Sequence, residues 1–196
     1  GAFGGRLCDV AGGEAWPGGL GNIVFGDYRA LALPVPDTPY GESQMALSPC
    51  GLTDTVAGRD FYGDIEATLI GAGGYAWTEP GTAVNGSARR YYRFTYDWRQ
   101  DNHRTAARLD ALVDQIRLDH GNDQLQVDIV AHSMGGLVTR YWLRYGATDV
   151  LDSNDFPVNN DGARKARKVI LVGTPNLGST SALQQLLTGA DFGVNA

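Results

Sequence analysis

Apolar side chains recur with a helical or a strand period from residue 58 to residue 173. Over Gly58–Ile70 they recur at every fourth position, and glycines follow at 71, 73 and 74, which predicts an amphipathic helix with a glycine stop. Over Arg90–Trp98 one face is aromatic and the other mostly polar, in residue types that favour strands. The sequence therefore predicts a helix followed by a strand in this part of the chain.

Strand and helix patterns then alternate. The further elements that we predict, in chain order, are a helix over Ala106–Ile116 that ends at His120–Asn122, a strand over Leu125–Ala131, a helix over Met134–Tyr145, a polar loop over Asp149–Arg167 and a strand over Lys168–Gly173. Alternation of helices with nearly continuous apolar strands is typical of βαβ crossovers. We therefore predict the α/β class, with a mostly parallel sheet that helices cover on both faces.

The first 58 residues follow a different pattern. Glycine, proline and aspartate are dense there and the apolar runs are short, which predicts loops and short turns over a core. A chain of 196 residues, of which 43% are hydrophobic and 19% charged, can bury one sizeable core. We expect one domain over residues 1–196, with a loop region over 1–58 and a βαβ core over 59–196.

Charge narrows the classes of partner. The 16 basic side chains are outnumbered by 22 acidic ones, the net charge is -6, and the basic cluster at 164–168 is short. These values argue against nucleic acid as a partner.

The longest apolar stretches, such as Val169–Val172, fall far below the roughly 20 residues that span a bilayer, so we expect no transmembrane segment in this chain.

Neither the cysteines nor the start of the chain assigns a compartment. Cys8 and Cys50 are compatible with one disulfide in an exported protein and with two unrelated buried thiols. Gly1 is preceded by neither a methionine nor an apolar leader, so any signal peptide would lie upstream. We expect the chain to be an excerpt of a longer protein, and its localisation stays unknown.

The candidate chemistry lies between the second predicted strand and its helix. Ala131–Gly136 reads Ala-His-Ser-Met-Gly-Gly, a small-x-Ser-x-Gly turn. In the nucleophile elbow of α/β-hydrolases, a serine occupies such a strained strand-to-helix corner and projects its Oγ above the sheet. Ser133 is therefore the candidate nucleophile; the alternative is a serine N-cap on a glycine-rich turn.

A serine that attacks an ester also needs backbone donors for the oxyanion. One donor is expected to be the N–H of Met134, the residue after the nucleophile at a helix N-terminus. The second should come from an earlier glycine-rich loop, and Ala2 within Gly1–Gly5 is the candidate. Residues 1–58 would then hold an oxyanion loop and cap-like loops.

Several segments together resemble one family. In chain order they are Gly1–Leu7, Trp16-Pro17, Phe61–Gly63, Tyr96–Arg99, Ala131–Gly136 and Gly173–Ser179. The chain resembles the lecithin:cholesterol acyltransferase family, which also includes lysosomal phospholipase A2-like acyltransferases and bacterial relatives. The most specific part is Tyr-Asp-Trp-Arg at 96–99 followed by the serine turn.

The resemblance implies an α/β-hydrolase fold, here incomplete at both ends. It implies Ser133 as nucleophile, the N–H groups of Ala2 and Met134 as oxyanion hole, and a lipid ester as acyl donor. A membrane or lipoprotein surface is where such a substrate would be met. Asp97 and Arg99 are expected to form a buried ion pair rather than to take part in catalysis.

A serine nucleophile needs a histidine base and an acid that orients it. His103, His120 and His132 all precede or adjoin Ser133, although in this fold the triad histidine follows the serine along the chain. His132 is expected to pack beside the turn, His120 to lie at the opposite end of the sheet, and His103 to start a helix or lie on the surface. None of the three is a convincing base.

The acids offer no clearer partner. Asn176 stands where some lipases place the acid, and it carries no carboxylate. The acids after Ser133 fall in polar loops or near the C-terminus, where a solvated loop is the expected role: Asp149, Asp152, Asp155, Asp161 and Asp191. The resemblance implies that the triad acid and histidine lie beyond Ala196, so the chain alone is expected to be inactive.

The function expected from these observations is serine-dependent acyl transfer from a phospholipid-type ester to an alcohol or to water. It calls for neither a cofactor nor a metal. One alternative is a generic carboxylesterase or triacylglycerol lipase. Another, of a different class, is a non-catalytic lipid-binding module that keeps the serine turn and lacks a base.

Overall fold

The computed structural model describes residues 3–18, 28–33, 47–53, 55–56, 59–60, 62–151 and 156–188. The chain divides into two compact units. Unit 1 comprises residues 1–2, 62–94 and 100–176, and unit 2 comprises residues 3–61, 95–99 and 177–196. Each unit is therefore assembled from segments that are separated in the sequence.

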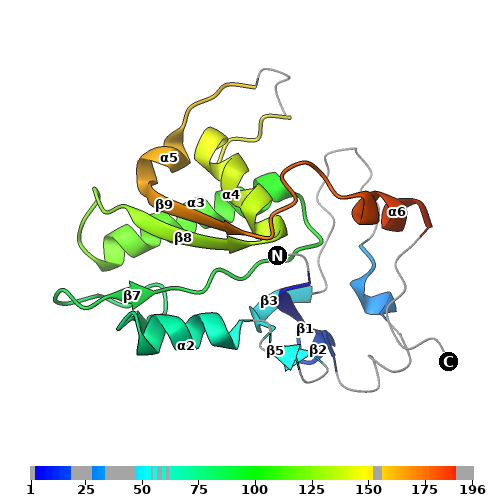
Figure 1. Cartoon of the computed structure of the whole chain (residues 1–196), viewed down its shortest axis with the longest axis horizontal. Helices are drawn as coiled ribbons and strands as arrows, with labels where there is room; N and C mark the ends of the chain where they lie inside the picture. The colour runs from blue at the N-terminus through cyan, green and yellow to red at the C-terminus, as the bar shows by residue number, and fades with distance from the viewer. Residues whose placement is uncertain are drawn as a thin grey trace. The chain divides into compact units, whose positions relative to one another are not determined.

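Unit 1 contains most of the helical residues (Figure 1). Its elements are α2 (Gly63–Gly71), β6 (Ala76–Trp77), β7 (Arg90–Tyr91), α3 (Asn102–Asp119), β8 (Val127–His132), α4 (Met134–Tyr145), α5 (Asp161–Lys165) and β9 (Ala166–Val172). Those of unit 2 are β1 (Gly5–Asp9), β2 (Glu14–Trp16), the 3-10 helix η1 (Arg29–Leu31), β3 (Leu47–Leu52), β4 (Thr55–Val56), β5 (Arg59–Asp60) and α6 (Thr180–Thr188). No helix among these described residues is both long and apolar enough to cross a membrane.

The parallel pair β8–β9 is the central feature of unit 1 and carries the candidate nucleophile at its end. From Asp128↔Lys168 to His132↔Val172 the two strands stay in register, and Figure 1 shows them side by side. α4 packs on both strands and α3 packs on α4. Trp142 of α4 is 0% exposed, and its indole N–H donates to Asp110 of α3 at 2.8 Å.

The sheet of unit 1 is smaller than predicted within the described residues. A second parallel pair, β6–β7, is not joined to β8–β9 there. The cross-strand partners Val130 and Ile170 remain 48% and 55% exposed, so one face of β8–β9 is left uncovered by the described part of the chain. The parallel strand direction agrees with the prediction, whereas one continuous sheet with helices on both faces stays a prediction.

The helices that sequence periodicity predicts are present, with shifted ends in two cases. α4 has the predicted bounds. α3 starts earlier than predicted because the Asp101 side chain accepts a hydrogen bond from His103 N and caps it. α2 begins at Gly63 rather than Gly58, and residues 58 and 61 lie outside the described residues.

The predicted strand over Arg90–Trp98 is wrong beyond its first two residues. Only Arg90 and Tyr91 pair with β6. β6 is soon followed by Pro80, which has no N–H to donate and ends the ladder. Among the described residues, β7 therefore ends at Tyr91.

The predicted polar loop over Asp149–Arg167 also needs correction, because it contains α5 and the start of β9. α5 is too short and too polar to show a hydrophobic period. It forms where the chain packs against α4: a Cβ on Gly162 would lie 2.3 Å from the Trp142 carbonyl oxygen. α6 is a further short helix that sequence periodicity did not predict.

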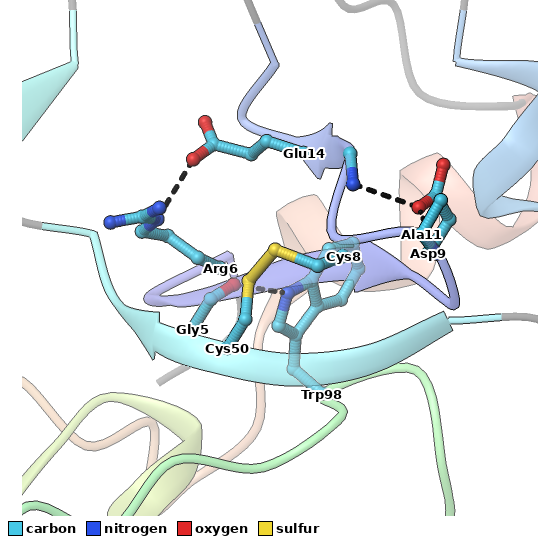
Figure 2. The surroundings of a disulfide bond; sticks show 9 residues. Gly5, Arg6, Cys8, Asp9, Ala11, Glu14, Cys50 and Trp98 are labelled. Atoms are coloured by element: carbon cyan, nitrogen blue, oxygen red, sulfur yellow. Dashed lines mark hydrogen bonds and ion pairs between the residues drawn. A yellow bond between two sulfur atoms is a disulfide. The ribbon is translucent and has the colours of Figure 1, made fainter.

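Unit 2 corrects the prediction of loops and turns over the first 58 residues. β1 lies between β2 and β3 in an antiparallel three-stranded sheet. Its strands are short, and β1 and β3 contain glycine or proline, so their alternation is weak in the sequence. Figure 2 shows the disulfide between Cys8 of β1 and Cys50 of β3, whose Cα atoms are 5.8 Å apart. The question of whether these cysteines pair is thereby answered.

The core of unit 2 is aromatic. Leu7, Trp16 and Leu47 are buried together, with Phe3 and Trp98 packed against them. The indole N–H of Trp98 donates to the Gly5 carbonyl at 3.1 Å (Figure 2), and that of Trp16 donates to the Phe3 carbonyl at 2.9 Å. Both indoles thus satisfy their one polar group inside an apolar cluster, as buried tryptophans require.

The segment 95–99 brings the predicted ion pair into unit 2. Arg99 contacts both carboxylate oxygens of Asp97, at 2.8 Å and 2.7 Å, and the two side chains are 6% and 1% exposed. Arg99 also donates to the Leu31 carbonyl at 3.1 Å. This bidentate pair is held by further hydrogen bonds, which is the arrangement that a buried charge pair requires.

Candidate active site

Ser133 occupies the corner between β8 and α4. Its backbone lies at φ 54° and ψ -124°, in a region that residues other than glycine rarely adopt. Such a conformation costs on the order of 1–3 kcal/mol and persists only where the surrounding structure holds it. The serine side chain makes no capping hydrogen bond to α4, so the N-cap alternative does not describe its role here.

Two backbone hydrogen bonds hold this corner. The Ser133 N–H donates to the Val172 carbonyl of β9 at 2.8 Å, and the Gly136 N–H donates to the Ser133 carbonyl at 3.0 Å. Side-chain packing adds a third constraint, because a Cβ on Gly136 would lie 1.9 Å from Oγ1 of Thr174. Gly136, which follows the small-x-Ser-x-Gly turn, must therefore be glycine, because a side chain there would collide with the loop after β9.

The structure describes one of the two expected oxyanion donors. Met134 is the first residue of α4, where backbone N–H groups have no partner within the helix. Ala2 lies outside the described residues. Its neighbour Phe3 is described and has a left-handed backbone at φ 62°. The roles of Met134 and Ala2 stay predictions.

His132, the neighbour of the candidate nucleophile, packs beside the corner as expected. Its Nδ1 lies 3.2 Å from the hydroxyl of Tyr62, and the two rings meet edge to face with centroids 5.8 Å apart. Burial lowers the pKa of His132 below its ordinary value of 6.5 and raises the pKa of Tyr62. The imidazole is therefore neutral near pH 7.

The lowered pKa of His132 predicts that acid reduces the free energy of unfolding. The unfolded chain takes up its proton near pH 6.5, before folded His132 does, so unfolding binds protons between the two pKa values. The contribution of His132 to the free energy of unfolding is thus full above pH 6.5 and falls as the pH drops toward the lower folded-state pKa. The urea unfolding midpoint should fall less between neutral and acidic pH in His132→Gln than in the unaltered chain. If the midpoint of His120→Gln showed the same smaller fall, the assignment of this pH dependence to His132 would be contradicted.

The other two histidines are engaged away from Ser133. His103 lies in the first turn of α3, with Nδ1 3.2 Å from Asp101 and Nε2 3.1 Å from Asp149. Nε2 of His120, at the end of α3, lies 3.1 Å from the Tyr92 hydroxyl. Within the described part of the chain, the Ser133 hydroxyl has no hydrogen bond to a histidine.

The acids considered above are also engaged elsewhere or lie outside the described residues. Asp161 forms an ion pair with Arg164 on α5. Asp152, Asp155 and Asp191 are outside the described residues. Asn176 accepts a hydrogen bond from Arg140 of α4 at 2.9 Å. No base and acid are thus brought to Ser133 by the residues that the structure describes.

Sequence reasoning missed three residues that support the corner: Tyr62, Arg140 and Thr174. Thr174 could have been suspected, since it directly follows a predicted strand next in order to the one that carries Ser133. Tyr62 is 70 residues from His132 and carries no local signal of this contact. The described residues contain no group of three or more His, Cys, Asp or Glu side chains that could hold a metal ion.

Comparison with known proteins gives a family match. A family model described as lecithin:cholesterol acyltransferase matches residues 85–196, which is more than half of the chain. The matched range contains α3, β8, the Ser133 corner, α4 and β9. Neither a curated protein nor a solved structure matches the chain.

Proposed function

This chain belongs to the lecithin:cholesterol acyltransferase family, and we propose that it moves an acyl group from a lipid ester through an acyl-enzyme on Ser133. The family implies an α/β-hydrolase-type fold, and its members are acyltransferases and esterases that act on lipid substrates. The serine mechanism and the phospholipid-type donor are the parts that we add. The observation that carries the serine mechanism is the strained backbone of Ser133, whose hydroxyl makes no capping hydrogen bond. The lipid donor rests on the family match.

The proposed reaction has two steps. Oγ of Ser133 attacks the ester carbonyl carbon while a base takes its proton, and the N–H groups of Met134 and Ala2 stabilise the oxyanion. Collapse of this intermediate forms the acyl-serine and breaks the ester bond, and the leaving alkoxide takes the proton. An alcohol or water then attacks the acyl-serine, which restores the hydroxyl. No residue of the described chain is assigned as the base or its acid partner.

We also propose the finer architecture that this mechanism uses. It is a mostly parallel sheet with helices on both faces, in one domain whose βαβ core is 59–196 and whose first 58 residues carry the β1–β3 sheet. The parallel pairs β8–β9 and β6–β7 and the packing of α4 on β8 support it. The substrate would be met at a lipid surface, because the family acts on lipids.

The experiment is covalent labelling of the complete gene product with a fluorophosphonate, followed by peptide mass mapping. We expect one adduct, on Ser133, that is lost in Ser133→Ala. Ser87→Ala, which removes an exposed serine of unit 1, should keep the full labelling. The proposal is rejected by an unlabelled protein, the result expected of a non-catalytic lipid-binding module, or by an adduct that survives Ser133→Ala.

The acceptor separates an acyltransferase from a carboxylesterase or triacylglycerol lipase, which would use the same corner. With phospholipid vesicles and an added long-chain alcohol, a transferase forms the new ester at the expense of free fatty acid. Release of fatty acid alone would assign the chain to the hydrolases. Either product must disappear in Ser133→Ala.

A further inference from the structure

The contact between Tyr62 and His132 joins two distant parts of unit 1. Tyr62 directly precedes α2, and His132 is the last residue of β8. The tyrosine hydroxyl lies 3.2 Å from Nδ1 of the imidazole, and the rings meet edge to face. Burial raises the pKa of the Tyr62 phenol, so the hydroxyl keeps its proton and can donate it in this hydrogen bond.

The opposite side of the imidazole faces the loop after β9. Its Cδ2 and Nε2 atoms lie 3.9 Å from the position that a Cβ on Gly173 would take. Gly173 itself has a left-handed backbone at φ 58°, where a larger residue would be strained. The His132 ring is therefore bounded by Tyr62 and by the loop that follows β9.

The position of His132 gives this packing its importance. His132 is bonded directly to Ser133, whose unusual backbone conformation must be imposed by its surroundings. Two backbone hydrogen bonds and the contact of Gly136 with Thr174 hold the corner from Ser133 onward. The contacts of the His132 ring add a constraint one residue earlier, because a change in the His132 backbone would move the ring away from Tyr62 and from the loop after β9.

We propose that Tyr62 is a positioning residue: its hydroxyl holds the His132 ring and thereby keeps the Ser133 corner in its strained conformation. Tyr62 acts through His132 and does not touch the reacting atoms. The effect on reactivity rests on the proposed function of Ser133, whereas the effect on the corner's conformation does not.

Tyr62→Phe tests this proposal by removing one oxygen atom and keeping the ring. Tyr141→Phe is the matched control in the same unit, because that hydroxyl donates to the Thr148 carbonyl at 2.7 Å and accepts from the Val150 N–H at 3.2 Å. Amide hydrogen exchange of Ser133 reports opening of the corner, since this N–H is bonded to Val172 in the closed form. We expect exchange to become about fivefold faster in Tyr62→Phe, as loss of one hydrogen bond predicts.

Tyr141→Phe should leave the exchange of Ser133 unchanged, because it loosens the 148–150 segment only. Equal acceleration in both variants would mean a general loss of stability, and no acceleration in Tyr62→Phe would mean that the hydroxyl does not hold the corner. Either result overturns the proposal.

Reactivity gives a second readout. In the complete gene product, Tyr62→Phe should slow fluorophosphonate labelling by about the same factor, and Tyr141→Phe should not. If Ser133 of the unaltered protein is not labelled at all, the proposed function fails, while the exchange comparison still decides whether Tyr62 holds the corner.

Discussion

Gly136→Ala is expected to destabilise unit 1 by about 3 kcal/mol or more and to disrupt the Ser133 corner. The added Cβ would lie 1.9 Å from Oγ1 of Thr174 and 2.8 Å from its Cβ. Rotation of the threonine moves Oγ1 but not Cβ, so the backbone of α4 or of the loop after β9 must shift. Overpacking of a well-filled core typically costs about 1–3 kcal/mol, and a contact this short that rotation cannot relieve belongs at or above the top of that range.

Urea unfolding followed by 19F signals of 5-fluorotryptophan measures this loss, since Trp77 and Trp142 report on unit 1. Gly71→Ala is the matched control: it adds the same methyl at the end of α2, where nothing lies within 4 Å, and should be neutral or slightly stabilising. Adding Thr174→Gly to Gly136→Ala should recover part of the stability. A Gly136→Ala protein as stable as Gly71→Ala would refute the packing argument.

Loss of the Cys8–Cys50 disulfide is expected to cost unit 2 roughly 4 kcal/mol. The bridge joins residues that are 42 positions apart, and the chain-entropy relation gives roughly this value for a loop of that length. The bridge ties β1 to β3, which pair from Gly5↔Leu52 to Asp9↔Leu47. Replacing both cysteines by alanine therefore removes a large share of the stability of unit 2.

The same fluorine signals test this prediction, with Trp16 and Trp98 as reporters of unit 2. Their midpoint should fall strongly in the double alanine variant and in the reduced chain. The signals of Trp77 and Trp142 serve as the internal control and should move much less. Unchanged midpoints for Trp16 and Trp98 would show that unit 2 does not depend on the bridge.

Long elements with a strong period could be predicted from the sequence, and short ones could not. α4 carries apolar side chains on one stripe over its whole length, so its bounds were predicted to the residue. Arg90–Trp98 has the right residue types for a strand, but strand pairing depends on the partner, and Pro80 ends that partner early. α5 and β1 to β3 depend on packing and on a disulfide, neither of which leaves a local pattern.

The residues of the candidate site also fall into those that local sequence predicts and those that it does not. Ser133 could be found because its corner needs small residues at fixed local positions. Tyr62 and Thr174 support that corner through contacts between segments far apart in the sequence. The position of Thr174 directly after a predicted strand gives a hint of its role, but no local pattern gives the contact of Tyr62, which is 70 residues from His132.

The discontinuity of unit 2 has a consequence for synthesis of the chain on the ribosome. Trp98 completes the aromatic core by donating to Gly5, and Arg99 reaches Leu31, yet both emerge well after residues 3–61. At translation rates of about 5–20 residues per second, the N-terminal strands wait a few seconds for their last partner. During that interval the nascent sheet exposes edges and aromatic side chains, so this segment is where we expect chaperones to engage the newly made protein.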